Sequence, residues 1–186
     1  MKKKQLVPKA VLFLICLSIF SYPSCDSRRN EIEKQVSLLY SSIIEIPYSE
    51  MDTLVLDTEY MHKKDKYQFL VFVDSTQCTP CYASHHQDWK YILKECKKHY
   101  QPVSLSVIIE SKSISDEIRE IFLSSSIGES IFLDTNAVFR KHNPFFPESD
   151  LMHVLLLDKD GSVVFVGNPL RSKEIEELLY KKLNIL

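Results

Sequence analysis

The 186-residue chain has little glycine, little net charge and no long apolar run near its start. Only three glycines occur, and there is no internal repeat or low-complexity tract, so nothing points to a repeat protein. The formal net charge is −2 with both signs well mixed, which gives no indication of a surface that binds nucleic acid or another polyanion. The mostly apolar stretch at residues 10–20 is too short to span a bilayer as a helix.

That stretch has instead the features of an export signal. Lysines at positions 2–4 precede it, and Ser24 and Cys25 follow it after a short interval. The pattern resembles a bacterial lipoprotein signal, in which the cysteine becomes the lipidated first residue of the mature protein. An ordinary cleaved signal that ends near a cysteine is the alternative. Either interpretation predicts export to a compartment in which disulfides can form.

Export would leave about 160 residues, enough for one domain with a sizeable core. We divide the chain into a signal peptide at 1–24, a tether with an N-terminal helix at 25–47, and a main domain at 48–186. Within the second segment, residues 26–30 are predicted to be a polar tether. A helix is predicted from there to about Ile46, because apolar residues recur at spacings of three and four.

The main domain alternates strand patterns with helix patterns. Strands are predicted at residues 53–57, 67–73, 103–109, 130–133, 151–157 and 162–166. Helices are predicted at residues 79–99, from Ser113 to Gly128, and from Ser172 onward. The last two strands are expected to form a hairpin, because a glycine-containing turn separates them.

The most informative segment is Cys78-Thr79-Pro80-Cys81, which lies shortly after the apolar run at 67–73. Two cysteines at positions i and i+3 at the start of a helix can close a small disulfide, and the helix N-terminus stabilises a thiolate on the first. Pro80 suits the first helical turn, where its missing N–H would be unpaired anyway. The pattern predicts a redox site, with a structural disulfide or half of a metal site as alternatives.

The order of these elements, with the cysteine motif at the first strand-to-helix junction, resembles the thioredoxin superfamily. The likeness extends from about residue 67 to residue 186 and is carried by the runs at 69–74 and 155–167 around the hairpin. It is closest to the membrane-tethered bacterial thiol–disulfide oxidoreductases and the redoxin-like lipoproteins. The resemblance implies an α/β thioredoxin-like fold, with a central mixed sheet flanked by helices and, here, an N-terminal helix extension.

The same resemblance implies a function and its residues. Cys78 would be the nucleophile and Cys81 the resolving thiol, and Cys25 would carry the lipid anchor. The protein would lie at a membrane facing the periplasm and act on a disulfide of a partner protein, more often as a reductant than as an oxidant. We expect no cofactor and no nucleic-acid partner.

Three positions differ from the family pattern. Gln77 stands where a tryptophan usually precedes the first cysteine, and Phe72 stands where thioredoxin has a buried carboxylate that relays protons. The family's cis-proline position corresponds to Met152, with His153 beside it. A cis bond without proline costs about 3 kcal/mol, so we expect the bond before Met152 to be trans. The alternative function is a redoxin-fold module that binds a protein partner, copper or zinc, with little turnover.

Several other residues have more than one interpretation. His85 and His153 are candidate ligands of zinc or copper, but ligands strung along one helix do not converge easily, so we assign no metal. The apolar stripe of the helix predicted at 79–99 includes either His85 or His86, and we expect His85 to be partly buried on this inner face. Cys96 lies on the same stripe, and we expect it to be a buried apolar residue rather than a redox thiol. A remaining aromatic group either caps the core below the hairpin or forms a docking surface, the first being favoured: Phe139, Phe145 and Phe146.

Overall fold

The computed structural model describes residues 24–56, 66–99, 103–125 and 127–185. The chain divides into two compact units, residues 1–37 and 38–186. The predicted signal peptide lies almost wholly outside the described residues, and it stays a prediction. Among the helices within the described ranges, none is both long enough and apolar enough to cross a membrane.

The helix α2 (Ser24–Tyr40) differs at both ends from the predicted N-terminal helix. Residues 26–30 are helical rather than a tether, and an i, i+4 ion pair of 2.8 Å between Arg29 and Glu33 supports the helix there. The helix ends at Tyr40 instead of near Ile46. Ser41 and Ser42 direct their hydroxyls back to the Leu38 carbonyl, which turns the chain out of the helix.

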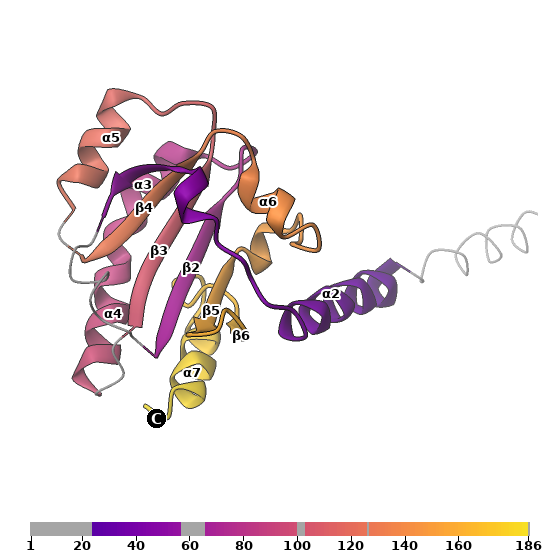
Figure 1. The fold of residues 1–186 in the computed structure, drawn as a ribbon. Helices are drawn as coiled ribbons and strands as arrows, with labels where there is room; N and C mark the ends of the chain where they lie inside the picture. The colour runs from indigo at the N-terminus through magenta and orange to yellow at the C-terminus, as the bar shows by residue number, and fades with distance from the viewer. Residues whose placement is uncertain (1–23, 57–65, 100–102, 126, 186) are drawn as a thin grey trace, which may run out of the picture. The chain divides into compact units, whose positions relative to one another are not determined.

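A six-stranded mixed sheet forms the centre of the second unit, in the order β1-β4-β3-β2-β5-β6 (Figure 1). Its strands are β1 (Asp52–Val55), β2 (Tyr67–Val73), β3 (Val103–Glu110), β4 (Glu129–Asp134), β5 (Val154–Asp158) and β6 (Val163–Val166). The strands β2, β3 and β4 are parallel, β5 and β6 are antiparallel to their neighbours, and β1 is antiparallel to β4. The apolar run of β2 fits its central place, because both of its faces are covered.

The helices connect these strands much as predicted, but several elements differ. They are η1 (Tyr48–Glu50), α3 (Thr79–His85), η2 (His86–Asp88), α4 (Trp89–Lys98), α5 (Asp116–Leu123), α6 (Val138–His142), η3 (Asp150–Met152) and α7 (Lys173–Lys182). The single helix predicted at 79–99 is divided by the short 3-10 turn η2. The helix α6 was not predicted, and the strand predicted from residue 151 begins only at Val154, because η3 occupies the positions before it.

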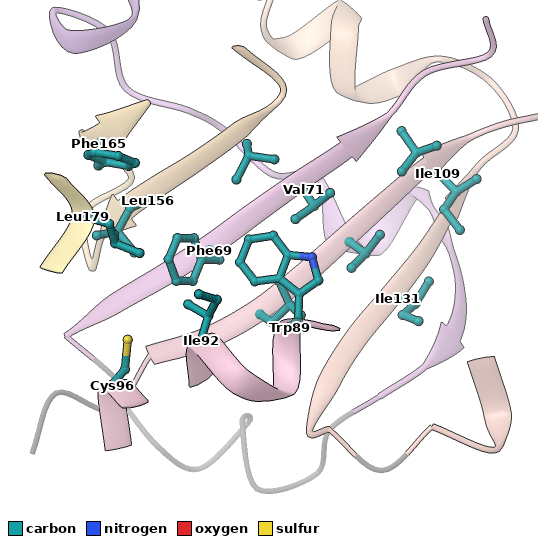
Figure 2. Packing of buried hydrophobic residues seen from close by; sticks show 14 of the residues in the cluster. Phe69, Val71, Trp89, Ile92, Cys96, Ile109, Ile131, Leu156, Phe165 and Leu179 are labelled. Carbon is teal, nitrogen blue, oxygen red and sulfur yellow. The ribbon is translucent and has the colours of Figure 1, made fainter. Parts of the chain in front are cut away.

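The main hydrophobic core lies on one face of the sheet. Phe69, Val71 and Val73 of β2 point to this face and meet side chains of α3, α4, α5 and α7. Figure 2 shows Trp89 and Ile92 of α4 next to Phe69 and Val71, and places Cys96, Phe165 and Leu179 toward one side of the same cluster. Cys96 is fully buried, and burial raises the pKa of its thiol to about 12, so its interpretation as an apolar core residue is confirmed.

The opposite face of the sheet is closed by aromatic rings. The ring of Phe72 lies 4.9 Å from that of Phe139 and 5.3 Å from that of Phe146, measured between centroids. Phe139 and Phe146 are buried and Phe145 is half-buried. The favoured interpretation of this group as a cap on the core is therefore confirmed, although it covers β2 rather than lying below the hairpin.

The chain has a thioredoxin-like fold. From β2 onward the elements follow the predicted order, with the cysteine motif between β2 and α3 and a C-terminal antiparallel hairpin followed by α7. The mixed sheet flanked by helices matches the expected architecture, and α2 supplies the expected N-terminal helix.

Candidate functional site

The loop between β2 and α3 is held by one carboxylate. Asp74 follows Val73 directly, and its Oδ1 accepts hydrogen bonds from the backbone N–H of Thr76 (2.7 Å) and from the Thr76 hydroxyl (2.6 Å). The backbone of Gln77 donates to the Asp74 carbonyl at 3.0 Å, and the Gln77 side chain accepts from the Asp74 N–H at 3.2 Å. This closed turn positions Cys78 at the start of α3.

Cys78 and Cys81 form a disulfide, with their Cα atoms 5.1 Å apart. Cys78 is the N-cap residue of α3, and its Sγ accepts the backbone N–H of Cys81 at 3.3 Å. Pro80 lies in the first turn, as expected. Both cysteines are exposed. The sulfur of Cys81 is therefore not shielded by α3, although Cys81 lies in the first turn of that helix. The disulfide is therefore accessible to a second protein.

A cleft of about 500 Å³ opens beside the disulfide. Residues that line it come from the end of β2, the cysteine loop, α3, η2, the start of α4, η3, the start of β5 and the segment after β6. They include Gln77, Cys78, Cys81, Asp88, Asp150, His153, Leu170 and Arg171. Asp150 and Arg171 form an ion pair of 2.6 Å. The cleft thus combines the sulfurs of the disulfide with polar and apolar side chains from other elements.

In the loop before β5, the residue at the cleft is not the one that the sequence analysis matched to the family's cis-proline. Met152 is buried and is not among the residues that line the cleft, whereas His153 and Val154 are. Within the described residues no peptide bond is cis, so the bond before Met152 is trans, as expected. The N–H groups of Met152 and His153 donate inside η3, and the His153 carbonyl accepts from Phe72. A partner chain would therefore meet side chains at this wall instead of these backbone groups.

His153 is held in an enclosed position next to the cysteine loop. Its side chain is 2% exposed, its ring stacks on Phe146, and its Nε2 lies 2.9 Å from the Pro147 carbonyl. Its Nδ1 lies 3.7 Å from Asp74 Oδ2. Burial lowers the pKa of the imidazole, and this outweighs the opposite effects of the Pro147 carbonyl and Asp74.

Arg140 of α6, which is half-buried, lies next to Asp74. Its guanidinium lies 3.7 Å from Asp74 Oδ2, 3.4 Å from Glu110 Oε2 and 5.0 Å from the centre of the Phe72 ring. Burial acts to raise the pKa of Asp74, but the Thr76 hydrogen bonds, His153 and Arg140 together hold that pKa below its usual value.

Sequence reasoning missed Asp74 and Arg140 as parts of the site. The position of a carboxylate between the apolar run and the first cysteine was the available signal for Asp74. Arg140 gave none, because its helix was not predicted.

Of the two adjacent histidines where α3 gives way to η2, the structure buries His86 and not His85. His85 is 79% exposed and lies 3.6 Å from Asp88, whereas His86 is 1% exposed and its Nε2 lies 3.4 Å from Glu129 Oε1. The expectation that His85 is partly buried was wrong, because the break at η2 turns His86 to the core instead. Burial acts to lower the pKa of His86, but hydrogen bonds to Glu129 and the Ala83 carbonyl raise it overall. Over the described part of the chain, no three His, Cys, Asp or Glu side chains are grouped to hold a metal ion.

Comparisons with known proteins add a fold-level likeness. No protein-family model matches the chain, and no curated protein matches it in sequence. A thioredoxin-like protein from Porphyromonas gingivalis is similar in structure, with 16% identity, TM-score 0.45, and coverage of 77% of this chain and 93% of that one. The thioredoxin domain of a thiol-disulfide oxidoreductase from Bacteroides vulgatus gives 14% identity, TM-score 0.46, and coverage of 77% and 96%. A thioredoxin-like protein in its oxidised form gives 15% identity, TM-score 0.48, and coverage of 76% and 94%.

These scores are too low to support an argument, so the fold assignment rests on the strand order and on the place of the cysteines. On that basis, this chain is a thioredoxin-like protein in fold, with a disulfide between Cys78 and Cys81 at the junction of β2 and α3.

Proposed function

We propose that this protein is a thiol–disulfide oxidoreductase, in which the reduced Cys78/Cys81 dithiol reacts with a disulfide of a partner protein and closes to the Cys78–Cys81 disulfide. The observation that carries the proposal is the exposed disulfide at the start of α3, beside an open cleft. A disulfide that only stabilises the fold has no need to be exposed at the start of a helix. A disulfide that takes part in exchange must be accessible to the sulfur of an attacking thiolate.

The exchange proceeds in two displacements. In the reduced protein, the Cys78 thiolate attacks one sulfur of the partner disulfide, forms a mixed disulfide and releases the other partner sulfur as a thiolate. Cys81 then attacks Cys78, which closes the Cys78–Cys81 bond and releases the second partner sulfur. The Cys81 N–H, which reaches Cys78 Sγ in the disulfide form, is placed to stabilise the Cys78 thiolate. The partner gains two electrons, and this reducing direction is the one we propose.

The decisive experiment combines turnover with trapping. Purified wild-type protein is expected to accelerate the reduction of insulin disulfides by dithiothreitol. Cys81→Ser is expected to accumulate mixed disulfides with a partner from the cell envelope, visible as bands that a reductant removes. Cys78→Ser/Cys81→Ser is the matched control and should trap nothing. Absence of both turnover and trapping would favour the alternative, a binding module with little turnover. That alternative is compatible with the loop before β5, where the N–H groups of Met152 and His153 are already hydrogen-bonded within the protein.

We further propose that the protein is a lipoprotein facing the periplasm, anchored through Cys25. The support is the sequence alone: lysines at 2–4, the apolar stretch at 10–20, and a small residue before the cysteine. The backbone of Cys25 lies in α2, and its side chain is outside the described part.

Cys25→Ala is expected to release the protein from membranes or to leave the precursor unprocessed, because it removes the lipidated residue. Detergent partitioning and the mass of the mature N-terminus measure this, with Cys96→Ala as a cysteine variant that should stay membrane-bound. Recovery of the wild-type protein in the soluble periplasm, starting at a residue other than Cys25, would contradict the anchor.

A further inference from the structure

A buried pair of titratable side chains lies at the C-terminal end of the helix that carries the cysteines. Cys78 is the N-cap residue of α3, and His86 is its C-cap residue. His86 Nε2 lies 3.4 Å from Oε1 of Glu129, the first residue of β4, and both side chains are buried. Because β4 lies between β1 and β3, the pair joins α3 to the interior of the sheet.

The hydrogen bonding of His86 decides which ring nitrogen faces Glu129 as an acceptor. His86 Nδ1 lies 2.9 Å from the Ala83 carbonyl. A carbonyl oxygen only accepts, so Nδ1 carries a proton, and in the neutral imidazole Nε2 is then an acceptor. This nitrogen faces a carboxylate oxygen, which is also an acceptor. Apart from each other, these two buried atoms have no hydrogen-bond partner among the described residues.

Two buried acceptors that face each other are unfavourable, because each has lost its hydrogen bonds to water. One proton removes this conflict, whether it makes His86 Nε2 a donor or makes Glu129 a carboxylic acid that donates to Nε2. In the unfolded chain both groups are solvated, with ordinary pKa values of about 6.5 for histidine and about 4.3 for glutamate. The folded chain therefore retains one proton at a pH at which the unfolded chain has released it.

The groups around the pair favour the charged imidazole. Burial acts to lower the pKa of His86, but the contacts described above and the negative charge of Asp88 in η2 raise it overall. From α3, the Tyr82 ring lies 6.5 Å from the His86 ring, and burial raises the pKa of the Tyr82 hydroxyl so far that it stays neutral. From α5, the uncharged ring of Phe122 lies 5.2 Å from the His86 ring.

We propose that the His86–Glu129 pair is a proton-dependent link that holds the C-terminal end of the cysteine helix on β4. With the proton bound, the pair is hydrogen-bonded and stabilises the folded chain. When the proton is released to solvent at higher pH, two unsatisfied acceptors remain and this stabilisation is lost. The inference goes beyond the proposed oxidoreductase function and does not depend on it.

Above about pH 6.5, the pKa of an unfolded histidine, raising the pH should destabilise the folded chain. The pKa of His86 is raised in the folded chain, so the stabilisation is complete below that pH and is lost as the pH rises through the folded-state value. One proton that only the folded chain binds lowers the folding equilibrium constant by up to about tenfold per pH unit in that window.

Urea unfolding between about pH 6 and about pH 9 tests the link, because this range brackets the expected change. The protein is kept oxidised, so that Cys78 and Cys81 do not titrate. Unfolding is followed by the fluorescence of Trp89, the only tryptophan of the chain. The wild-type folding constant is expected to fall as the pH rises above about 6.5.

His86→Gln and Glu129→Gln are each expected to remove most of this fall. In both variants an amide N–H can donate to the remaining partner, so the contact no longer needs a titrating proton. His85→Gln is the matched control, because it changes the adjacent histidine, which is exposed and lies 3.6 Å from Asp88. It should keep the wild-type pH dependence.

No difference in pH dependence between the wild-type protein and either His86→Gln or Glu129→Gln would overturn the inference. Loss of the dependence in His85→Gln would also overturn it, because the effect would then not belong to the buried pair. If the variants do not fold, NMR titration of the wild-type protein decides. The His86 ring should titrate above about pH 6.5, and a midpoint at or below that value would overturn the link. None of these outcomes bears on insulin reduction or trapping, so failure of the link leaves the proposed function standing.

Discussion

Cys78→Ser is expected to lower the rate of disulfide exchange to that of the uncatalysed reaction. A serine oxygen cannot form the mixed disulfide, and Cys81 lacks the contact with a helix N–H that favours a thiolate at Cys78. In the wild-type reduced protein, Cys78 should react with iodoacetamide at pH 6 at least about tenfold faster than a free thiol, of which less than about 1% is ionised there. Mass spectrometry of the alkylated peptides measures the rate at each cysteine.

Cys96→Ser is the control for this experiment. Its thiol is buried and has a pKa raised to about 12, so both alkylation at pH 6 and exchange should be unaffected by its removal. Cys96→Ser should instead lower the free energy of unfolding by about 1–3 kcal/mol, because it places a hydroxyl in an apolar core. If Cys78 is alkylated only near the pH at which a free cysteine ionises, then the start of α3 does not stabilise its thiolate. That result would contradict the enzyme assignment and indicate that the fold serves only as a scaffold.

Trp89→Ala is expected to lower the free energy of unfolding by about 3–5 kcal/mol. Trp89 is 1% exposed, its ring lies 5.0 Å from that of Phe69 between centroids, and it joins α4 to the centre of the sheet (Figure 2). Typical domains are stable by about 5–15 kcal/mol, so this single change would remove a large part of the total. Urea unfolding followed by circular dichroism measures it, since the only tryptophan is lost.

Lys90→Ala is the matched control, because Lys90 is the next residue of α4 and is exposed. Its effect should stay within about 0.5 kcal/mol. Equal urea midpoints for Trp89→Ala and Lys90→Ala would contradict the packing of Trp89 between α4 and β2.

The strands and the cysteine motif were predictable because their signals are local. The buried strand at 67–73 coincides with β2 from first to last residue, since an apolar run of that length between polar residues favours a covered strand. Ser172, where the last helix was predicted to begin, is the N-cap of α7, and the helix predicted from Ser113 has its N-cap two residues later, at Ser115. Each of these features depends on neighbours within about four residues, which is the range over which sequence patterns act.

The wall opposite the disulfide was not predictable in the same way. Counting along the chain placed Met152 opposite the cysteines, but η3 takes up residues 150–152 and brings His153 to the cleft. Likewise, on one continuous helix either His85 or His86 could belong to the apolar stripe that faces the core. The break at η2 places His86 in the core and leaves His85 exposed. A shift of one residue changes which side chain faces the site, and local patterns are not accurate to one residue at the end of an element.

The sequence by itself determined the type of chemistry: two cysteines at positions 78 and 81, at the start of a helix after a buried strand. The tertiary structure alone decided what surrounds them. Asp74, Arg140 and His153 come from three separate elements, and they meet because β2, α6 and the loop before β5 converge at one end of the sheet. Electrostatic interactions depend on distance in space, and only the folded chain brings residues so far apart in sequence within 4 Å.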